Sequence, residues 1–369
     1  MQNRRWGLDL LRAIAILVVV EQHGRYISEK IGNKLQFIGL TDGVDLFFVL
    51  SGFLIGAILI KDYSENESLN IKRFWIRRWL RTLPIYLVAL LLNIFFMLFI
   101  FKYDFDLTDM FLHFGFIQNM IPPYTDYRFF SEAWSLSIEE FFYLGLPLTI
   151  AVAIYFTKKQ NESYIFLRAL SFLVLFSFCF RAFLYHRLPA ESFSLTEWNT
   201  RFRVIIPERL DSLAIGVFAA LIRFKYSILW HSKSFRWISF IIGLLIVICL
   251  DRTWIFNNTI PLGFFAFVPY FLIYSIGVAF TLPLLDSFQP KENLFTKSVS
   301  QVSKLSYSMY LFHNSLLVIP MKNYSHTLTN EYLKVGLYLL YWVLVFLISY
   351  VGYTLIEKPV LKYRDKIYA

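Results

Sequence analysis

Two polar residues inside the first apolar stretch of the chain, Arg12 and His23, have types and spacing suited to chemistry. They are eleven residues apart, so in a helix they share one face, about 16 Å apart along the axis. A charge facing lipid costs at least about 2.5–3.5 kcal/mol, so this face is expected to look into protein or a wet cavity. His23, near the outer end of the helix, could act as a general base. The alternative for Arg12 is a plain ion pair with an acid on a neighbouring helix.

Two carboxylates are candidates to assist His23. Asp45 begins the apolar stretch GVDLFFVLSGFLIG, where it could fix the imidazole tautomer; the alternative is a helix-start acid stabilised by the helix dipole. In SEAWSLSIEEFFYLGLP, Ser137 and Glu140 have the spacing of a capping box, which gives both a structural reason. Glu139 has no such reason, and we predict a functional role for it.

A dense basic cluster lies in the stretch IKRFWIRRWLRTLPIYL. It contains Arg73, Arg77, Arg78 and Arg81, four arginines in nine residues. Guanidinium groups bind phosphates through paired hydrogen bonds. The alternative is an anchor that only sets the orientation of a membrane helix. The cluster exceeds what orientation needs, so we predict a phosphate-bearing cytoplasmic ligand.

Two further stretches carry candidate residues. PERLDSLAIG places Arg209 and Asp211 at the outer end of an apolar segment, where they could form a local ion pair or contact a polar substrate. SKLSYSMYLFHNSLL places His313 near Tyr310. We interpret His313 as a satisfied packing group, with a catalytic role as the alternative.

The composition indicates a polytopic membrane protein. The 369 residues are 57% hydrophobic, with a mean hydropathy of +0.54 and only 17% charged residues. The formal charge of +10 suggests loops facing an anionic cytoplasmic leaflet, not a nucleic-acid partner. Cys179 and Cys249 lie in apolar runs and are interpreted as small core residues, with no disulfide or metal spacing. No cleavable signal peptide is expected.

The apolar segments predict an all-α fold of about ten transmembrane helices in a single domain, residues 1–369. The expected spans are 7–27, 43–60, 80–101, 134–156, 164–185, 207–223, 236–250, 261–284, 303–321 and 333–356. With these spans, 21 Lys and Arg fall on one side and 12 on the other, which predicts cytoplasmic termini.

Two local features refine this topology. The segment 107–120 is too short to span, so we expect a re-entrant or interfacial piece on the outer side; an eleventh span is the alternative and would reverse the downstream topology. Ser51 and Gly52 with Gly56 would allow a neighbouring helix to approach closely.

The chain resembles the acyltransferase family 3 membrane proteins, which are mostly bacterial O-acetyltransferases of cell-envelope and secreted glycans. The matching pieces, in family order along the chain, are LDLLRAIAILVVVEQH, GVDLFFVLSGFLIG, RRWLRTLPIY, WSLSIEEFFYL, RLDSLAIG, SYSMYLFH and EKP. The resemblance implies acyl transfer from cytoplasmic acyl-CoA, usually acetyl-CoA, to a hydroxyl across the membrane. It also implies functional roles for Arg12, His23, Arg78, Arg81 and Glu139. Some members carry a fused extracytoplasmic SGNH-type domain, and this chain resembles the stand-alone subset.

These observations together predict an enzyme of the bacterial inner (cytoplasmic) membrane with acetyl-CoA as co-substrate and an extracytoplasmic glycan or similar hydroxyl as acceptor. The arginines would hold the CoA phosphates, and His23 would take the acceptor's proton, oriented by Asp45 or Glu139. A covalent acyl-histidine is a variant. No metal or permanently bound cofactor is expected. The alternatives are a transporter or flippase and an acyl-CoA-binding receptor without turnover. The oligomeric state and the need for a separate extracytoplasmic partner stay open.

Overall fold

The computed structural model describes residues 5–28, 30–31, 43–101, 107–124, 129–157, 162–189, 194–250 and 263–367, and all regular elements within them are helices. The predicted all-α fold is therefore confirmed for this part of the chain. Residues 32–42 and 251–262 of the predicted outer loops, including the start of the span 261–284, lie outside the described residues.

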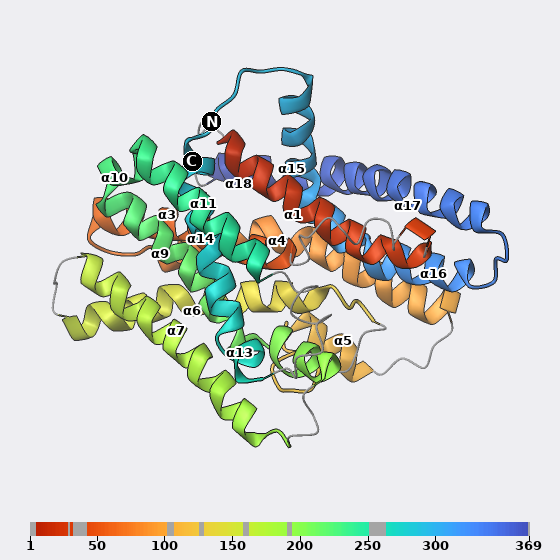
Figure 1. Cartoon of the computed structure of the whole chain (residues 1–369), viewed down its shortest axis with the longest axis horizontal. Helices are drawn as coiled ribbons and strands as arrows, with labels where there is room; N and C mark the ends of the chain where they lie inside the picture. Colours follow the sequence, from red (N-terminus) through yellow and green to blue (C-terminus); the bar gives the residue numbers. More distant parts are fainter. Residues whose placement is uncertain are drawn as a thin grey trace.

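Each predicted span overlaps a long helix, but the span 303–321 begins inside its helix and continues through the π-helix Asn314–Val318 into the next short helix. The long helices are α1 (Trp6–Gly24), α3 (Gly43–Asn66), α4 (Ile71–Phe95), α6 (Ala133–Thr157), α7 (Glu162–Arg187), α9 (Leu210–Lys225), α11 (Lys233–Cys249), α14 (Tyr270–Ser287), α15 (Leu294–Phe312) and α17 (Glu331–Gly352). Shorter helices are α5 (Leu107–Phe114), α8 (Leu195–Trp198), α10 (Ser227–His231), α13 (Phe264–Phe267), α16 (Ile319–Ser325) and α18 (Lys358–Ile367). Figure 1 shows α1, α15 and α17 along one side of the bundle and α6 and α7 along the other.

Six of the described helices are long and apolar enough to cross a membrane by length and composition, so the predicted count of ten is not confirmed. Helices α9 and α11 have 16 and 17 residues, fewer than the roughly 20 that a bilayer requires. Helix α1 contains Asp9, Arg12 and Glu21, and these charges lower its hydropathy. The chain is nonetheless a multi-pass integral membrane protein on the evidence of its other long apolar helices.

Ion pairs join several helix termini at one end of the bundle. Asp286, at the end of α14, accepts from Arg5 before α1 and forms an ion pair with Arg223 near the end of α9, at 2.8 Å. At the start of α4, Arg77 lies 3.9 Å from Asp365 of α18. These contacts agree with the alternating helix directions that the predicted spans require.

Helices α3 and α9 are in backbone contact. A Cβ atom at Gly52 would overlap the carbonyl oxygen of Leu213, and one at Gly216 would overlap the carbonyl oxygen of Val49. Gly56 lies in the same way against Val217 of α9. The prediction that Gly52 and Gly56 permit a close helix approach is confirmed, and this contact holds α3 in place beside the site.

The segment 107–120 folds as the eight-residue helix α5 followed by turns, which is too short to span a bilayer. Several of its polar groups pair with protein, although the buried oxygens Gln118 Oε1 and Asn119 Oδ1 accept no hydrogen bond from a described residue. The Asn119 amide donates to the carbonyl of Trp134 at 2.9 Å, and the Ile206 amide donates to the carbonyl of Asn119 at 3.1 Å. Such pairing is the condition that the predicted re-entrant or interfacial piece has to meet.

Candidate functional site

A cavity of about 1810 Å³ opens at the end of the bundle where the helix termini meet. Its described lining includes nine Lys and Arg against five Asp and Glu, so it is electropositive. The rim carries exposed side chains such as Lys61, Arg73 and Asp365, whereas the inner wall carries buried ones such as Ser135 and Tyr310. The cavity therefore leads from a charged mouth into the interior of the bundle.

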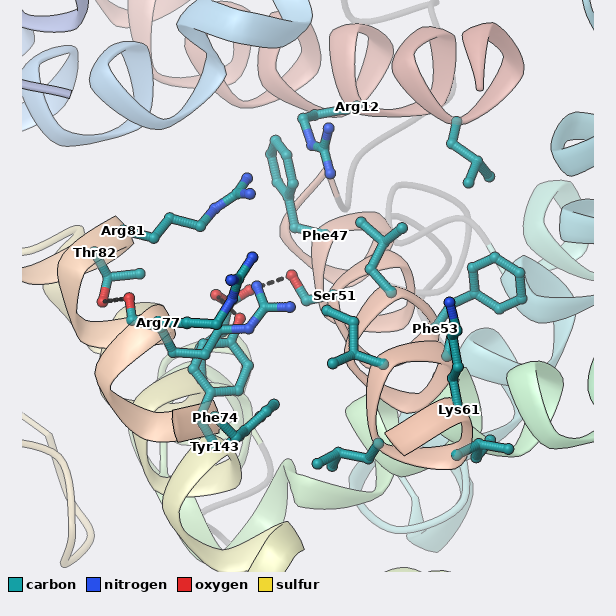
Figure 2. A pocket seen from close by; sticks show the side chains of 18 of the residues that line it. Arg12, Phe47, Ser51, Phe53, Lys61, Phe74, Arg77, Arg81, Thr82 and Tyr143 are labelled. Carbon is teal, nitrogen blue, oxygen red and sulfur yellow. Dashed lines mark hydrogen bonds between the residues drawn. The ribbon is translucent and has the colours of Figure 1, made fainter. Parts of the chain in front are cut away.

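Two arginines enter this cavity from different walls. Figure 2 shows Arg12 descending from α1 and Arg81 reaching from α4 toward the same space, with Ser51 of α3 opposite. Arg12 lies 3.6 Å from Asp9, which in turn accepts from Ser303 at 2.8 Å. Arg81 is exposed within the cavity and makes no hydrogen bond or ion pair with any described residue. A guanidinium in this state is available to an anionic ligand.

Glu139 lies with the arginines. Its carboxylate accepts from Ser51 at 2.9 Å and from Tyr143 at 2.6 Å, and it interacts electrostatically with Arg78. The Arg78 guanidinium in turn lies 5.8 Å from the centroid of the Tyr143 ring. The expectation that Glu139 orients His23 is thus not met, because its contacts are with the arginine-lined wall.

All four arginines of the predicted cluster line the cavity. Arg73 lies one turn before Arg77 and two turns before Arg81 on α4, and Arg78 directly follows Arg77. Asn70 caps this helix by accepting from the Arg73 amide at 3.0 Å. The cap fixes the start of α4, and the first three turns of this helix carry the arginines that line the cavity.

A hydrogen-bonded pair of hydroxyls lies at the inner wall. The Tyr310 hydroxyl donates to the carbonyl of Glu132 at 3.1 Å, so the Ser135 hydroxyl, 2.6 Å away, is the donor to Tyr310. The Glu132 carboxylate accepts from the hydroxyl of Ser315 at 2.7 Å and from its amide at 3.2 Å. Burial raises the pKa of Glu132 to about 7. Glu132 and Ser135 were not predicted as site residues, although both lie in the stretch SEAWSLSIEE.

Two histidines meet just beyond this wall. His313 Nε2 lies 3.1 Å from His23 Nδ1, and His313 Nδ1 lies 2.7 Å from the carbonyl oxygen of Tyr310. His23 Nδ1 also lies 2.9 Å from the carbonyl oxygen of Val19. The interpretation of His313 as a packing group is incomplete, since its ring contacts the predicted base directly.

The carbonyl partners fix the tautomers of this pair. A carbonyl only accepts, so Nδ1 carries the proton in both rings. In neutral His313, Nε2 then accepts from His23 Nδ1–H. The remaining lone pair of neutral His23 is on Nε2, which makes this nitrogen the basic one. The pair thus has the arrangement of a base and its orienting partner.

The remaining acidic and basic candidates form buried ion pairs. Arg209 donates to Asp45, and Arg181 donates to Asp211 at 2.5 Å. The predicted pair of Arg209 with Asp211 is therefore wrong, and neither side chain is exposed to a substrate. The guanidinium of Arg209 also lies 4.0 Å from the centroid of the Phe271 ring. These contacts join the starts of α3 and α9 and the last turns of α7.

Two structural interpretations from the sequence are corrected. Helix α6 begins at Ala133, so Ser137 and Glu140 lie inside it and form no capping box. Ser137 accepts from Gln118 at 2.6 Å, and Glu140 accepts from Thr82 at 2.7 Å. Cys179 and Cys249, interpreted as core residues, are free and exposed on helix surfaces.

Comparison with known proteins gives a family match over nearly the whole chain. Residues 5–357 match the model of the acyltransferase domain family. O-acetyltransferase OatA of Staphylococcus aureus strain NCTC 8325 / PS 47 is 27% identical over 389 residues, covering 98% of this chain and 58% of the relative. OatA of S. aureus strain COL matches with the same identity and coverage. The chain thus spans a little over half the length of these relatives. No solved structure matches it significantly.

Proposed function

The chain belongs to this acyltransferase family, and we propose that it transfers an acetyl group from acetyl-CoA to a hydroxyl of an extracytoplasmic glycan. One observation carries the proposal: an electropositive cavity runs from an arginine-rich rim to Tyr310, whose carbonyl lies 2.7 Å from the ring of His313, the partner of His23. The relatives' name, O-acetyltransferase, supports oxygen as the acceptor atom.

The donor is expected to enter at the charged mouth. CoA carries its phosphates at one end and its thioester at the other, with a thin pantetheine arm between them. Arg73 and Arg77 at the rim, followed by Arg78 and Arg81, would hold the phosphates with charge-assisted hydrogen bonds. The arm would extend past Arg12 toward Ser135 and Tyr310, bringing the thioester to the inner wall.

The histidine pair would activate the acceptor. His23 Nε2 takes the proton of the acceptor hydroxyl as its oxygen attacks the thioester carbonyl, and the C–S bond breaks. The CoA thiolate then receives this proton, so the products are an ester and free CoA. His313 Nε2 accepts from His23 Nδ1 throughout and so keeps the ring oriented for the transfer.

We propose that the cavity mouth and both termini are cytoplasmic. The support is the Lys and Arg asymmetry of the loops together with the ion pairs that gather these helix ends. Single cysteines at Ser68 and Thr329, in a chain whose Cys179 and Cys249 are replaced by Ala, test this. Labelling by an impermeant maleimide in intact cells is expected at Thr329→Cys only. Labelling at Ser68→Cys before permeabilisation would reverse the topology.

The reaction itself is tested with the purified chain in lipid nanodiscs. Acetyl-CoA labelled in its acetyl group and envelope glycans of the producing bacterium are the substrates. We expect acceptor-dependent release of free thiol and label on the glycan. A transporter or flippase would bind or move glycan without releasing thiol. No thiol release by protein that still binds acetyl-CoA would point to a receptor or to a missing partner.

A further inference from the structure

Helix α18 contributes two residues to the cavity rim to which the proposed reaction assigns no role. Helix α18 packs against α4, and Arg364 and Asp365 both line the cavity. The Asp365 carboxylate oxygen Oδ1 accepts from Arg364 Nη2 at 2.6 Å and from Arg364 Nε at 2.9 Å. The same oxygen lies 3.9 Å from Arg77 Nη2 of α4. One carboxylate oxygen is thus shared by guanidinium groups from two helices.

More than one cation lies around this carboxylate. Arg77 interacts electrostatically with Arg364, with Asp365 and with Arg73. Asp365 has 59% of its side chain exposed, whereas Arg364 has only 16%, so the acid is the more accessible partner. The exposed carboxylate is therefore the partner that an incoming anion can replace.

A phosphate monoester fits this place better than the carboxylate does. At neutral pH it carries about 1.5–2 negative charges and three acceptor oxygens. Two guanidinium forks can bind it together, each through two hydrogen bonds. A diphosphate bridge lacks a terminal oxygen set of this kind, so a terminal phosphate is the preferred ligand.

We propose that Arg364 and Arg77 form a subsite for the 3′-phosphate of the acyl donor, and that Asp365 occupies this subsite until the donor displaces it. The inference rests on the proposed function in that the donor is a CoA thioester, which carries this phosphomonoester on its ribose. It assigns α18 a role in donor selection: CoA is distinguished from its 3′-dephospho form at the rim, far from the histidines.

The test compares two ligands on the full chain in nanodiscs. The dissociation constants of CoA and 3′-dephospho-CoA are measured by calorimetry. Loss of a charge-assisted contact typically weakens binding about ten- to a hundredfold. We expect Arg364→Gln to weaken CoA binding by at least about tenfold and dephospho-CoA binding by less than about twofold. Lys362→Gln, an exposed cation on the same helix that does not line the cavity, is the matched control and should change neither.

Asp365→Asn separates the proposal from a purely structural role of α18. If Asp365 only occupies the phosphate subsite, this variant should bind CoA more tightly while dephospho-CoA changes less. If Asp365 is a latch that holds α18 to α4, the variant should bind both ligands more weakly, and the proposal is overturned. Equal effects of Arg364→Gln on both ligands would also overturn it. Failure of the unaltered chain to bind CoA at all would instead reject the proposed function.

Discussion

His313 Nε2 lies 3.1 Å from His23 Nδ1, although 290 residues of sequence separate them. The contact follows from the packing of α15 against α1, which brings the end of one helix beside the last turn of the other. Arg12 lines the cavity from the same helix that carries His23, and Tyr310 does so from the helix that ends at His313. Two helices therefore provide both a cavity wall and the proposed base.

The first prediction concerns His23. His23→Gln should fold and bind acetyl-CoA normally but lose transfer by about 10²–10⁴-fold, because an amide can hydrogen-bond but cannot take a proton. The measurement is acetyl transfer by the purified variant, with CoA affinity and thermal unfolding measured alongside. Near-normal turnover would reject the assignment of His23 as the base.

The second prediction tests His313 as a positioning residue. His313→Gln can still present an amide oxygen to His23 Nδ1–H, whereas His313→Met has similar size and no comparable acceptor. We expect transfer by the Met variant to fall at least about tenfold below that of the Gln variant, since a misoriented base loses much of its advantage. Both variants should bind acetyl-CoA equally. Equal activity of the two variants at equal stability would return His313 to a packing role.

The third prediction separates two neighbouring arginines. Arg81 makes no hydrogen bond or ion pair with a described residue, so Arg81→Gln should weaken acetyl-CoA binding about ten- to a hundredfold and leave stability unchanged. Arg78 is less exposed than Arg81 and lies over the rings of Phe74 and Tyr143, so Arg78→Gln should lower both affinity and the thermal midpoint. Calorimetry and thermal unfolding give the two quantities. Unchanged affinity for acetyl-CoA in both variants would favour the alternative that these arginines only set the orientation of a membrane helix.

Local patterns in the sequence predict much of this fold. The helices of the apolar stretches follow from composition, and Arg12 and His23 share a face because both lie on one continuous helix. The capping box failed for a local reason: Ser137 and Glu140 match the spacing, but α6 begins one turn earlier, at Ala133. The pattern cannot tell a helix start from a position inside the helix.

Local sequence patterns do not predict contacts between helices that are distant in the sequence. The partner of His23 is a residue near the other end of the chain, and the partner of Asp45 is Arg209. Each contact depends on how the helices pack, and the spacing of apolar residues along one sequence does not specify that packing. Glu132 was not predicted as a site residue because it precedes the apolar run. Its buried environment and its hydrogen bonds from Ser315 arise only when the segment that follows α15 packs beside it.

The fourth prediction concerns pH and Glu132, which precedes the span of α6. Burial raises its pKa to about 7 from an ordinary value of 4.5, so the folded protein binds this proton more tightly than the unfolded chain does. Its contribution to stability is therefore present at low pH and lost as the pH rises from about 4.5 to 7. Glu132→Gln, which stays neutral, should remove that part of the pH dependence. Parallel pH profiles of thermal unfolding in the two proteins would contradict the assignment.

The fifth prediction asks whether Asp45 acts by structure or by catalysis. Asp45 and Arg209 are buried and paired, so removing one leaves an uncompensated charge. Breaking such a pair typically costs about 3–5 kcal/mol, and Asp45→Asn and Arg209→Gln should each lower the thermal midpoint strongly. The double variant replaces the pair by two amides that can hydrogen-bond to each other, so it should recover much of the stability and, with it, acetyl transfer. Thermal unfolding and turnover of all four proteins complete the cycle. A double variant that is stable, binds acetyl-CoA and yet is inactive would place Asp45 or Arg209 in the chemistry after all.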